Sequence, residues 1–121
     1  MVLDTNIIIA YLDGEEEVVA AVRQWFSDGI SLFISAVTYA EVLAVREVSA
    51  EDLQSMREFL DLLVLIPVDK VIAEEVAAIK RSEKLKFPDA AIVATARYTS
   101  STLVTRDKRL HRVRNITAIS I

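Results

Sequence analysis

The stretch MVLDTNIIIAYL, residues 1–12, joins a short apolar run to a helical apolar pattern through one acid. Val2 and Leu3 predict a short β-strand, and the isoleucines that follow predict a helix reaching Leu12. Asp4 stands at the junction and is the only charged residue of the stretch. A strand that passes directly into a helix is typical of α/β domains, in which parallel strands alternate with helices.

The same alternation continues to the end of the chain. Apolar residues at helical spacing predict helices at 15–26, 36–46, 49–63, 69–85 and 89–98, with Ser35, Ser49 and Asp69 as N-caps. Short β-rich runs predict further strands at 32–34, 64–66, 102–105 and 117–121. We therefore expect a single domain over residues 1–121, with a three-layer α/β/α fold around a mostly parallel sheet of about five short strands.

The composition narrows the classes of protein. The 121 residues are 53% hydrophobic, which suits one compact domain with a sizeable core. There is no cysteine, which excludes disulfides and thiolate zinc sites. The sequence shows neither a secretory signal nor an apolar stretch of roughly 20 residues. We expect a cytoplasmic protein that does not associate with membranes.

Three carboxylates are isolated in uncharged surroundings. Asp4 is the only charge in residues 1–12, Glu41 the only one in 29–45, and Asp89 the only one in 87–96. A carboxylate beside apolar packing loses hydration and needs a compensating partner. No Lys or Arg lies next to any of the three in sequence, so a divalent metal held by converging carboxylates is the simplest common partner.

Each acid also has a purely structural explanation. Asp4 can serve as a helix N-cap, and Asp89 can complement the positive end of a helix dipole. Asp107, between two basic residues, suits an ordinary turn. Glu41 is harder to explain in this way, because its helix is apolar nearly all round.

Charge is strongly divided along the chain, although the net charge is only −4. Residues 1–79 carry 4 basic and 15 acidic side chains, whereas residues 80–121 carry 10 basic and 3 acidic ones. The basic C-terminal third predicts either a surface that attracts phosphates or a solvated face that balances the acidic helices. The only histidine is His111, and the sequence gives no recognisable Ser/His/Asp nucleophile system around it. No Gly-rich phosphate loop is present.

Four motifs together resemble the PIN-domain ribonuclease family, and the chain's size and layout are similar to those of VapC toxins from toxin–antitoxin pairs. The motifs are LDTN at 3–6, SAVTYAEVL at 35–43, FPDAAIVATA at 87–96 and LVTRD at 103–107. Their order and spacing cover essentially the whole chain. One departure is Leu110, where the family often has an aromatic residue.

The resemblance implies a Mg²⁺- or Mn²⁺-dependent endoribonuclease that hydrolyses RNA phosphodiester bonds and acts as a toxin. It places Asp4, Glu41, Asp89 and Asp107 at the catalytic, metal-binding positions, and Thr5, Asn6 and Thr105 at supporting polar positions. It further implies a cognate antitoxin protein and a homodimer. From the basic segment we expect RNA-backbone contacts at Arg106, Lys108, Arg109 and Arg112.

Other readings stay open at this point. A receiver-like signalling domain also binds Mg²⁺ through acids on an α/β fold, although here the first strand ends in a single Asp and Asp69 is a poor phospho-acceptor. A PIN-like domain that processes RNA without being a toxin, or that binds RNA without cleaving it, is another alternative. The Asp-x-Asp start of a small phosphatase is absent, because Asn6 occupies the third position.

Overall fold

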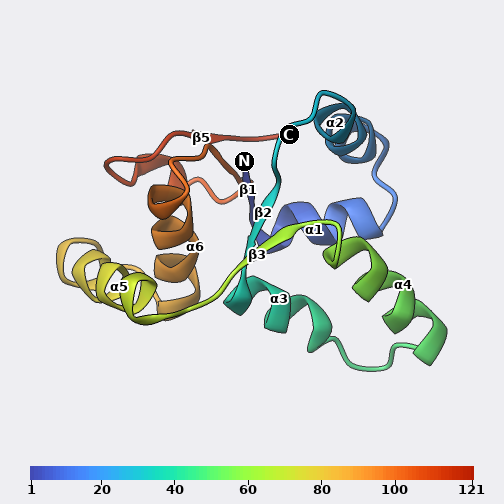
Figure 1. The fold of residues 1–121 in the computed structure, drawn as a ribbon, viewed down its shortest axis with the longest axis horizontal. Coiled ribbons are helices and arrows are strands. Elements are labelled where there is room, and N and C mark those ends of the chain that lie inside the picture. Colours follow the sequence, from blue (N-terminus) through green and yellow to red (C-terminus); the bar gives the residue numbers. More distant parts are fainter.

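The computed structural model describes all 121 residues and contains five strands alternating with helices (Figure 1). In chain order the elements are β1 (Val2–Leu3), α1 (Thr5–Leu12), α2 (Glu16–Ser27), β2 (Phe33–Ser35), α3 (Ala36–Leu43), α4 (Ala50–Leu60), β3 (Val64–Ile66), α5 (Lys70–Ser82), α6 (Phe87–Tyr98), β4 (Leu103–Val104), the 3₁₀ turn η1 (Leu110–Arg112) and β5 (Ala118–Ile119).

The strands form one sheet in the order β3-β2-β1-β4-β5, and every neighbouring pair is parallel. In the centre, Val2 pairs with Leu103 and Leu3 pairs with Val104. The predicted five-stranded sheet is therefore confirmed, and it is entirely parallel. Because all strands point the same way, their carboxyl ends lie along one edge of the sheet, where an α/β domain places its functional site.

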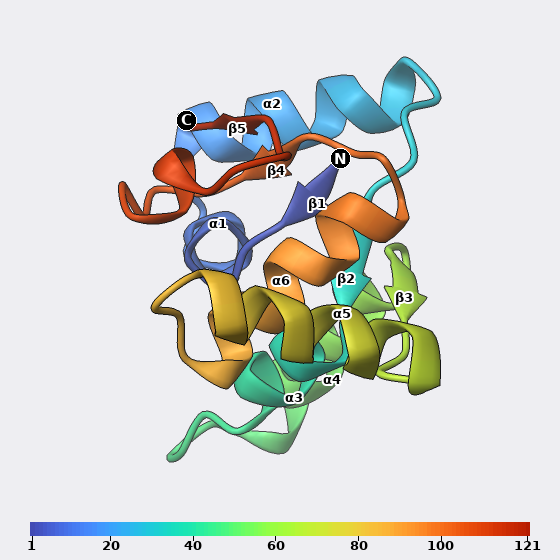
Figure 2. The ribbon, with the colours of Figure 1, turned by 90° about the vertical axis from the view of Figure 1, so that its left-hand side faces the viewer.

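Successive residues of the central strands face opposite sides of the sheet and build two separate cores. Val2 and Leu103 pack against α5 and α6, whereas Leu3 and Val104 pack on the other face with α1, α2 and α4. Figure 1 shows the sheet between these two groups of helices, and Figure 2 shows α5 and α6 covering the face turned toward the viewer. The expected three-layer α/β/α arrangement is confirmed.

The helix α3 contacts both layers, because it packs against α1 and α4 as well as α6. Its Val37 side chain joins the core beneath α5 and α6, and its Val42 side chain joins the opposite core. The helix therefore bridges the carboxyl end of the sheet and carries Glu41 between the two layers.

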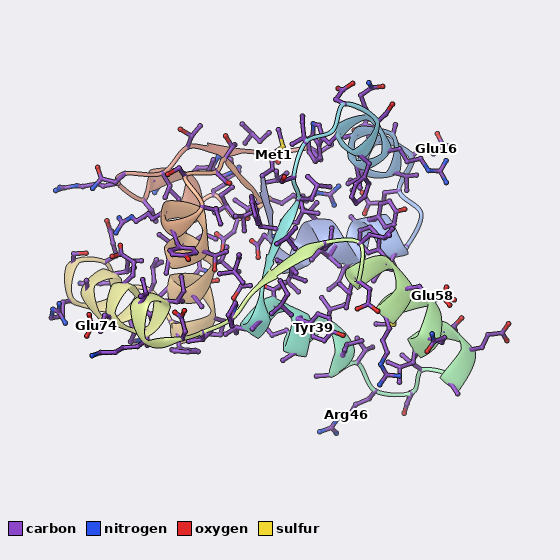
Figure 3. All side chains as sticks on the ribbon, viewed as in Figure 1. Met1, Glu16, Tyr39, Arg46, Glu58 and Glu74 are labelled. Atoms are coloured by element: carbon purple, nitrogen blue, oxygen red, sulfur yellow. The ribbon has the colours of Figure 1, made fainter.

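The predicted N-caps are all present. Hydroxyl or carboxylate oxygens of Ser35, Ser49 and Asp69 accept hydrogen bonds from the first-turn amides of α3, α4 and α5. Charged side chains on the helices and loops, such as Glu16, Arg46, Glu58 and Glu74, lie at the periphery (Figure 3).

Three predicted helix ends were too late. The fourth helix ends at Leu60, not near Leu63. The third helix ends at Leu43, not near Arg46, since the chain turns at Glu47, which has a positive φ of 60°. The fifth helix ends at Ser82, not near Leu85, and the Ser82 hydroxyl donates back to the carbonyl oxygens of the last turn. The sixth helix begins at Phe87, two residues earlier than predicted, with Pro88 in its first turn. No helix is both long enough and apolar enough to cross a membrane.

Candidate metal centre

The candidate site forms where strand ends and helix starts meet at the carboxyl edge of the sheet. Asp4 follows β1 directly and is the N-cap of α1, a passage that can be followed in Figure 2. Asp89 lies in the first turn of α6, and Asp107 lies in the loop after β4. Parallel topology thus brings acids from three distant parts of the sequence to one edge.

Asp4 is the buried centre of this arrangement, with only 5% of its surface exposed. Its Oδ1 accepts a hydrogen bond from the Thr5 amide at 2.7 Å. Its Oδ2 accepts bonds from the Thr105 hydroxyl at 2.5 Å and from Asn6 Nδ2 at 3.2 Å. Burial raises the pKa of the Asp4 carboxyl, the hydrogen bonds partly oppose this, and the negative charges of Asp89 and Asp107 raise it further.

Thr105 and Asn6 connect Asp4 to the loop that carries Asp107. The Thr105 hydroxyl, which is fully buried, donates to Asp4 and accepts the Asp107 amide proton at an N–O distance of 3.0 Å. The Asn6 side chain donates to Asp4 and accepts from the Arg106 amide at 3.2 Å. These two side chains, which the sequence predicted to support the acids, contact Asp4 directly and fix the start of the loop.

Glu41 joins the network from α3. Its Oε1 accepts a hydrogen bond from the Thr5 hydroxyl at 3.3 Å, and the Thr5 amide in turn donates to Asp4. Glu41 is exposed on its helix. One threonine therefore places the isolated glutamate beside the buried aspartate, and the exposed carboxylate is free to change rotamer.

Asp89 and Asp107 share one cation, the guanidinium of Arg109. Nη2 of Arg109 lies 2.7 Å from Oδ2 of Asp107 and 3.3 Å from Oδ2 of Asp89. Nε of Arg109 also donates to Oδ1 of Asp107 at 3.1 Å, which makes that pair bidentate. The bonded guanidinium lowers the pKa of the Asp107 carboxyl. The two carboxylates thus face a common point that a positive charge occupies.

The four basic residues expected to contact RNA have different surroundings. Arg109 is bound to the acids, and Arg106 makes two contacts to Glu15, at 2.6 and 3.2 Å, and one to the backbone carbonyl of Ile121. Lys108 and Arg112 are exposed and form no ion pair. Only these last two are free in this structure to meet a phosphate backbone.

The donor set suits a hard divalent cation, although the side chains are not arranged as a finished binding site. Carboxylate oxygens are the ligands that Mg²⁺ and Mn²⁺ prefer. Asp89 and Asp107 already hold one cationic group between them, and Asp4 is a buried acid close to both. No three Asp, Glu or His side chains lie close enough together to bind one ion in this conformation. The acids therefore fit a metal by chemistry and position, with side-chain movement needed to complete its coordination.

Sequence reasoning did not foresee the pairing of Arg109 with two acids, nor that of Arg106 with Glu15, a residue 91 positions away. It also assigned no role to His111, whose Nε2 lies 2.9 Å from the Thr105 carbonyl oxygen. The spacing of Asp107 and Arg109, two residues apart in a turn, was the one available sign of a local ion pair.

Comparisons with known proteins identify the family and support the fold. The family model described as PIN domain matches residues 1–116. A chain of the toxin–antitoxin complex from Klebsiella pneumoniae is 30% identical, with a TM-score of 0.83 over 98% of this chain and 94% of that chain. FitAcB from Neisseria gonorrhoeae is 25% identical, with a TM-score of 0.77 over 98% and 95% of the two chains.

VapBC2 from Rickettsia felis, bound to a DNA fragment from their promoter, has a TM-score of 0.84 over 99% of this chain and 97% of that chain. At 19% identity this likeness supports the fold alone. No curated protein matched the sequence. The match to the PIN-domain model excludes the alternative of a receiver-like signalling domain. The chain therefore belongs to the PIN-domain family, whose members are nucleases.

Proposed function

We propose that this protein is a metal-dependent endoribonuclease that hydrolyses RNA phosphodiester bonds, and that it is the toxin of a toxin–antitoxin pair. The observation that carries the proposal is the convergence of four acids at one edge of the sheet. A chain of side-chain and main-chain contacts runs from Glu41 through Thr5 to Asp4, and from there through Thr105 to Asp107. Arg109 then links Asp107 to Asp89.

In this proposal Asp4, Glu41, Asp89 and Asp107 hold Mg²⁺ or Mn²⁺, directly or through water. When bound, such an ion supplies positive charge that activates water and stabilises the phosphoryl oxygens during hydrolysis. The acids position the cation, and Asp4 is held rigidly by three hydrogen bonds while exposed Glu41 can adjust. Thr5, Asn6 and Thr105 keep the acids in register with one another.

The RNA substrate would lie over the same edge. Lys108 and Arg112 extend from the loop and turn that follow Asp107, so they are suited to contact the phosphates on either side of the cleaved bond. Their charges would also offset the repulsion between the acids and the RNA. Arg106 already pairs with Glu15, so we do not expect it to contact the RNA backbone.

The toxin role draws on the similar chain from Klebsiella pneumoniae, which was solved as part of a toxin–antitoxin complex. By that likeness we propose a cognate antitoxin as protein partner, a homodimer as the assembly, and the cytoplasm as the location. A small DNA-binding protein encoded next to this chain would support the toxin role. Its absence would favour the alternative of an RNA-processing enzyme.

Cleavage of a structured RNA in the presence and absence of Mg²⁺ or Mn²⁺ tests the activity. Asp4→Asn and Asp89→Asn should each abolish metal-dependent cleavage while the circular dichroism spectrum remains that of a folded protein. Glu74→Gln is the matched control, because it removes one acid from the outer side of α5 and should cleave like the wild type (Figure 3).

Undiminished cleavage by the folded Asp4 and Asp89 variants would reject the assigned site. RNA binding without cleavage under several divalent metals would instead favour a non-catalytic RNA-binding domain.

A further inference from the structure

Arg109 makes half of the ion pairs in the protein, and both are with acids of the candidate site. Its guanidinium binds Asp107 through both Nε and Nη2, and Nη2 also contacts Asp89. No other basic side chain forms an ion pair with any of the four acids. A single residue of the chain thus supplies the positive charge that this part of the cluster requires.

The guanidinium and a divalent metal would compete for the same oxygens. Magnesium binds carboxylate oxygens at about 2.0–2.1 Å and repels a neighbouring cation strongly at such range. Nη2 of Arg109 lies 2.7 and 3.3 Å from the two Oδ2 atoms that face the common point. While the guanidinium stays there, the carboxylates of Asp89 and Asp107 are positioned around its Nη2 nitrogen. The distances between this nitrogen and the carboxylate oxygens are too long for bonds to a metal ion.

Arg109 can leave this position at little cost. Its side chain is 65% exposed, so moving it into solvent uncovers little apolar surface. Ion pairs at such exposure contribute little to stability and weaken with salt. The Arg109 amide separately donates to Oδ1 of Asp107 at 2.9 Å, and this backbone contact would keep the loop in place after the side chain moved.

We propose that Arg109 is an internal counter-ion: it binds Asp89 and Asp107 while no divalent metal is present, and it leaves them when the metal binds. The released guanidinium remains at the edge of the site, where its planar fork suits a phosphate of the substrate. Metal binding would therefore convert Arg109 from a partner of the acids into a contact for RNA. This inference rests on the proposed function, since it requires the acids to be metal ligands.

Mn²⁺ binding measured by isothermal titration calorimetry tests the competition without any need for catalysis. Arg109→Gln removes the competing cation and should bind Mn²⁺ about three- to tenfold more tightly than the wild type. Arg112→Gln is the matched control, because it removes the same charge from an exposed residue of η1 that has no acidic partner. Arg109→Lys keeps the charge but not the fork, and should fall between Gln and the wild type.

The wild-type protein offers a second readout by NMR. When Mg²⁺ is added in the absence of Mn²⁺, the Nε–H resonance of Arg109 should shift. The Nε proton should also exchange faster with solvent once the bond to Asp107 is lost. Equal Mn²⁺ affinity in Arg109→Gln and Arg112→Gln, or weaker binding in Arg109→Gln, would overturn the counter-ion role while leaving a metal-dependent nuclease intact. Absence of metal binding in all variants and the wild type would overturn the proposed function as well.

Discussion

Replacing Thr105 with valine tests whether one buried hydroxyl holds the acidic site together. The Thr105 side chain is fully buried and its hydroxyl lies between Asp4 and the Asp107 amide. Valine has nearly the same shape, so the packing of the side chain is retained while the hydroxyl's hydrogen bonds to Asp4, from the Asp107 amide and from Asn6 Nδ2 are lost. The energetic cost of the change can therefore be assigned to the hydroxyl.

The expected cost follows from the partners. A hydrogen bond to a charged group contributes about 1.5–3 kcal/mol, and a buried donor left without a partner costs about 1 kcal/mol or more. Thr105→Val should therefore lower the free energy of unfolding by roughly 2–4 kcal/mol. Thr105→Ser is the control, because it keeps the hydroxyl and loses only a methyl group, at a cost of about 1 kcal/mol.

The stability lost in Thr105→Val should also depend on pH. The folded-state pKa of Asp4 is raised, chiefly by burial, and the Thr105 hydrogen bond opposes that rise. An acid whose pKa is raised by folding favours the folded state fully below its ordinary pKa, and this contribution is lost as pH rises through the raised value. Removing the hydroxyl raises the folded-state pKa of Asp4 further. Thr105→Val should therefore be more destabilising at neutral pH than at about pH 4.

Urea unfolding followed by circular dichroism, at neutral pH and at about pH 4, measures both effects. This role of the hydroxyl is refuted if the valine and serine variants lose the same stability, or if the stability lost in Thr105→Val is the same at the two pH values. Either result would mean that the hydroxyl does not stabilise the ionised carboxylate of Asp4.

Four other predictions concern the metal ion, the basic segment and the N-cap of α4. Mg²⁺ should raise the melting temperature of the wild type and EDTA should reverse the rise, because a ligand that binds only the folded state stabilises it; an unchanged melting curve would count against a metal site. Arg106→Ala, which breaks the contacts to Glu15, should change stability to urea little, because an exposed ion pair contributes little to folding, and it should leave RNA affinity unchanged. Neutralising Lys108 or Arg112 should instead weaken RNA binding and reduce its salt slope by about one each in a filter-binding titration, and equal slopes would remove them from the interface. Ser49→Ala should cost about 1 kcal/mol through the lost cap of α4 without changing cleavage, so a large fall in activity would contradict a purely structural role.

Local sequence signals predicted the elements well, because their causes are local. Ser35, Ser49 and Asp69 stand immediately before apolar periodic segments and cap the helices there. The ends of the third, fourth and fifth helices were predicted three residues too late, since apolar and charged residues such as Val45 and Lys84 carry no stop signal. Where those helices end depends on the turn that each connection needs.

The candidate site was predictable in part for a different reason. Asp4 and Asp89 stand out because no other charge surrounds them, whereas Asp107 lies between Arg106 and Lys108 and required the motif comparison. The pairing of Arg106 with Glu15 could not be seen, because a contact between residues 91 positions apart exists only once the sheet has formed. The four basic residues therefore seemed equivalent in sequence, although their surroundings in the fold differ.

The short segment that follows β4 joins the acids to the basic surface, and this has a thermodynamic consequence. Within it Thr105 and Asp107 belong to the acidic network, Arg109 neutralises that network, and Lys108 and Arg112 point to solvent. If metal binding releases Arg109 for a phosphate, linkage requires that phosphate binding strengthens metal binding by the same factor. The substrate would then help to assemble the site that cleaves it. Measured Mn²⁺ affinity should accordingly rise in the presence of a non-cleavable RNA, and this rise should be smaller in Arg109→Gln than in the wild type.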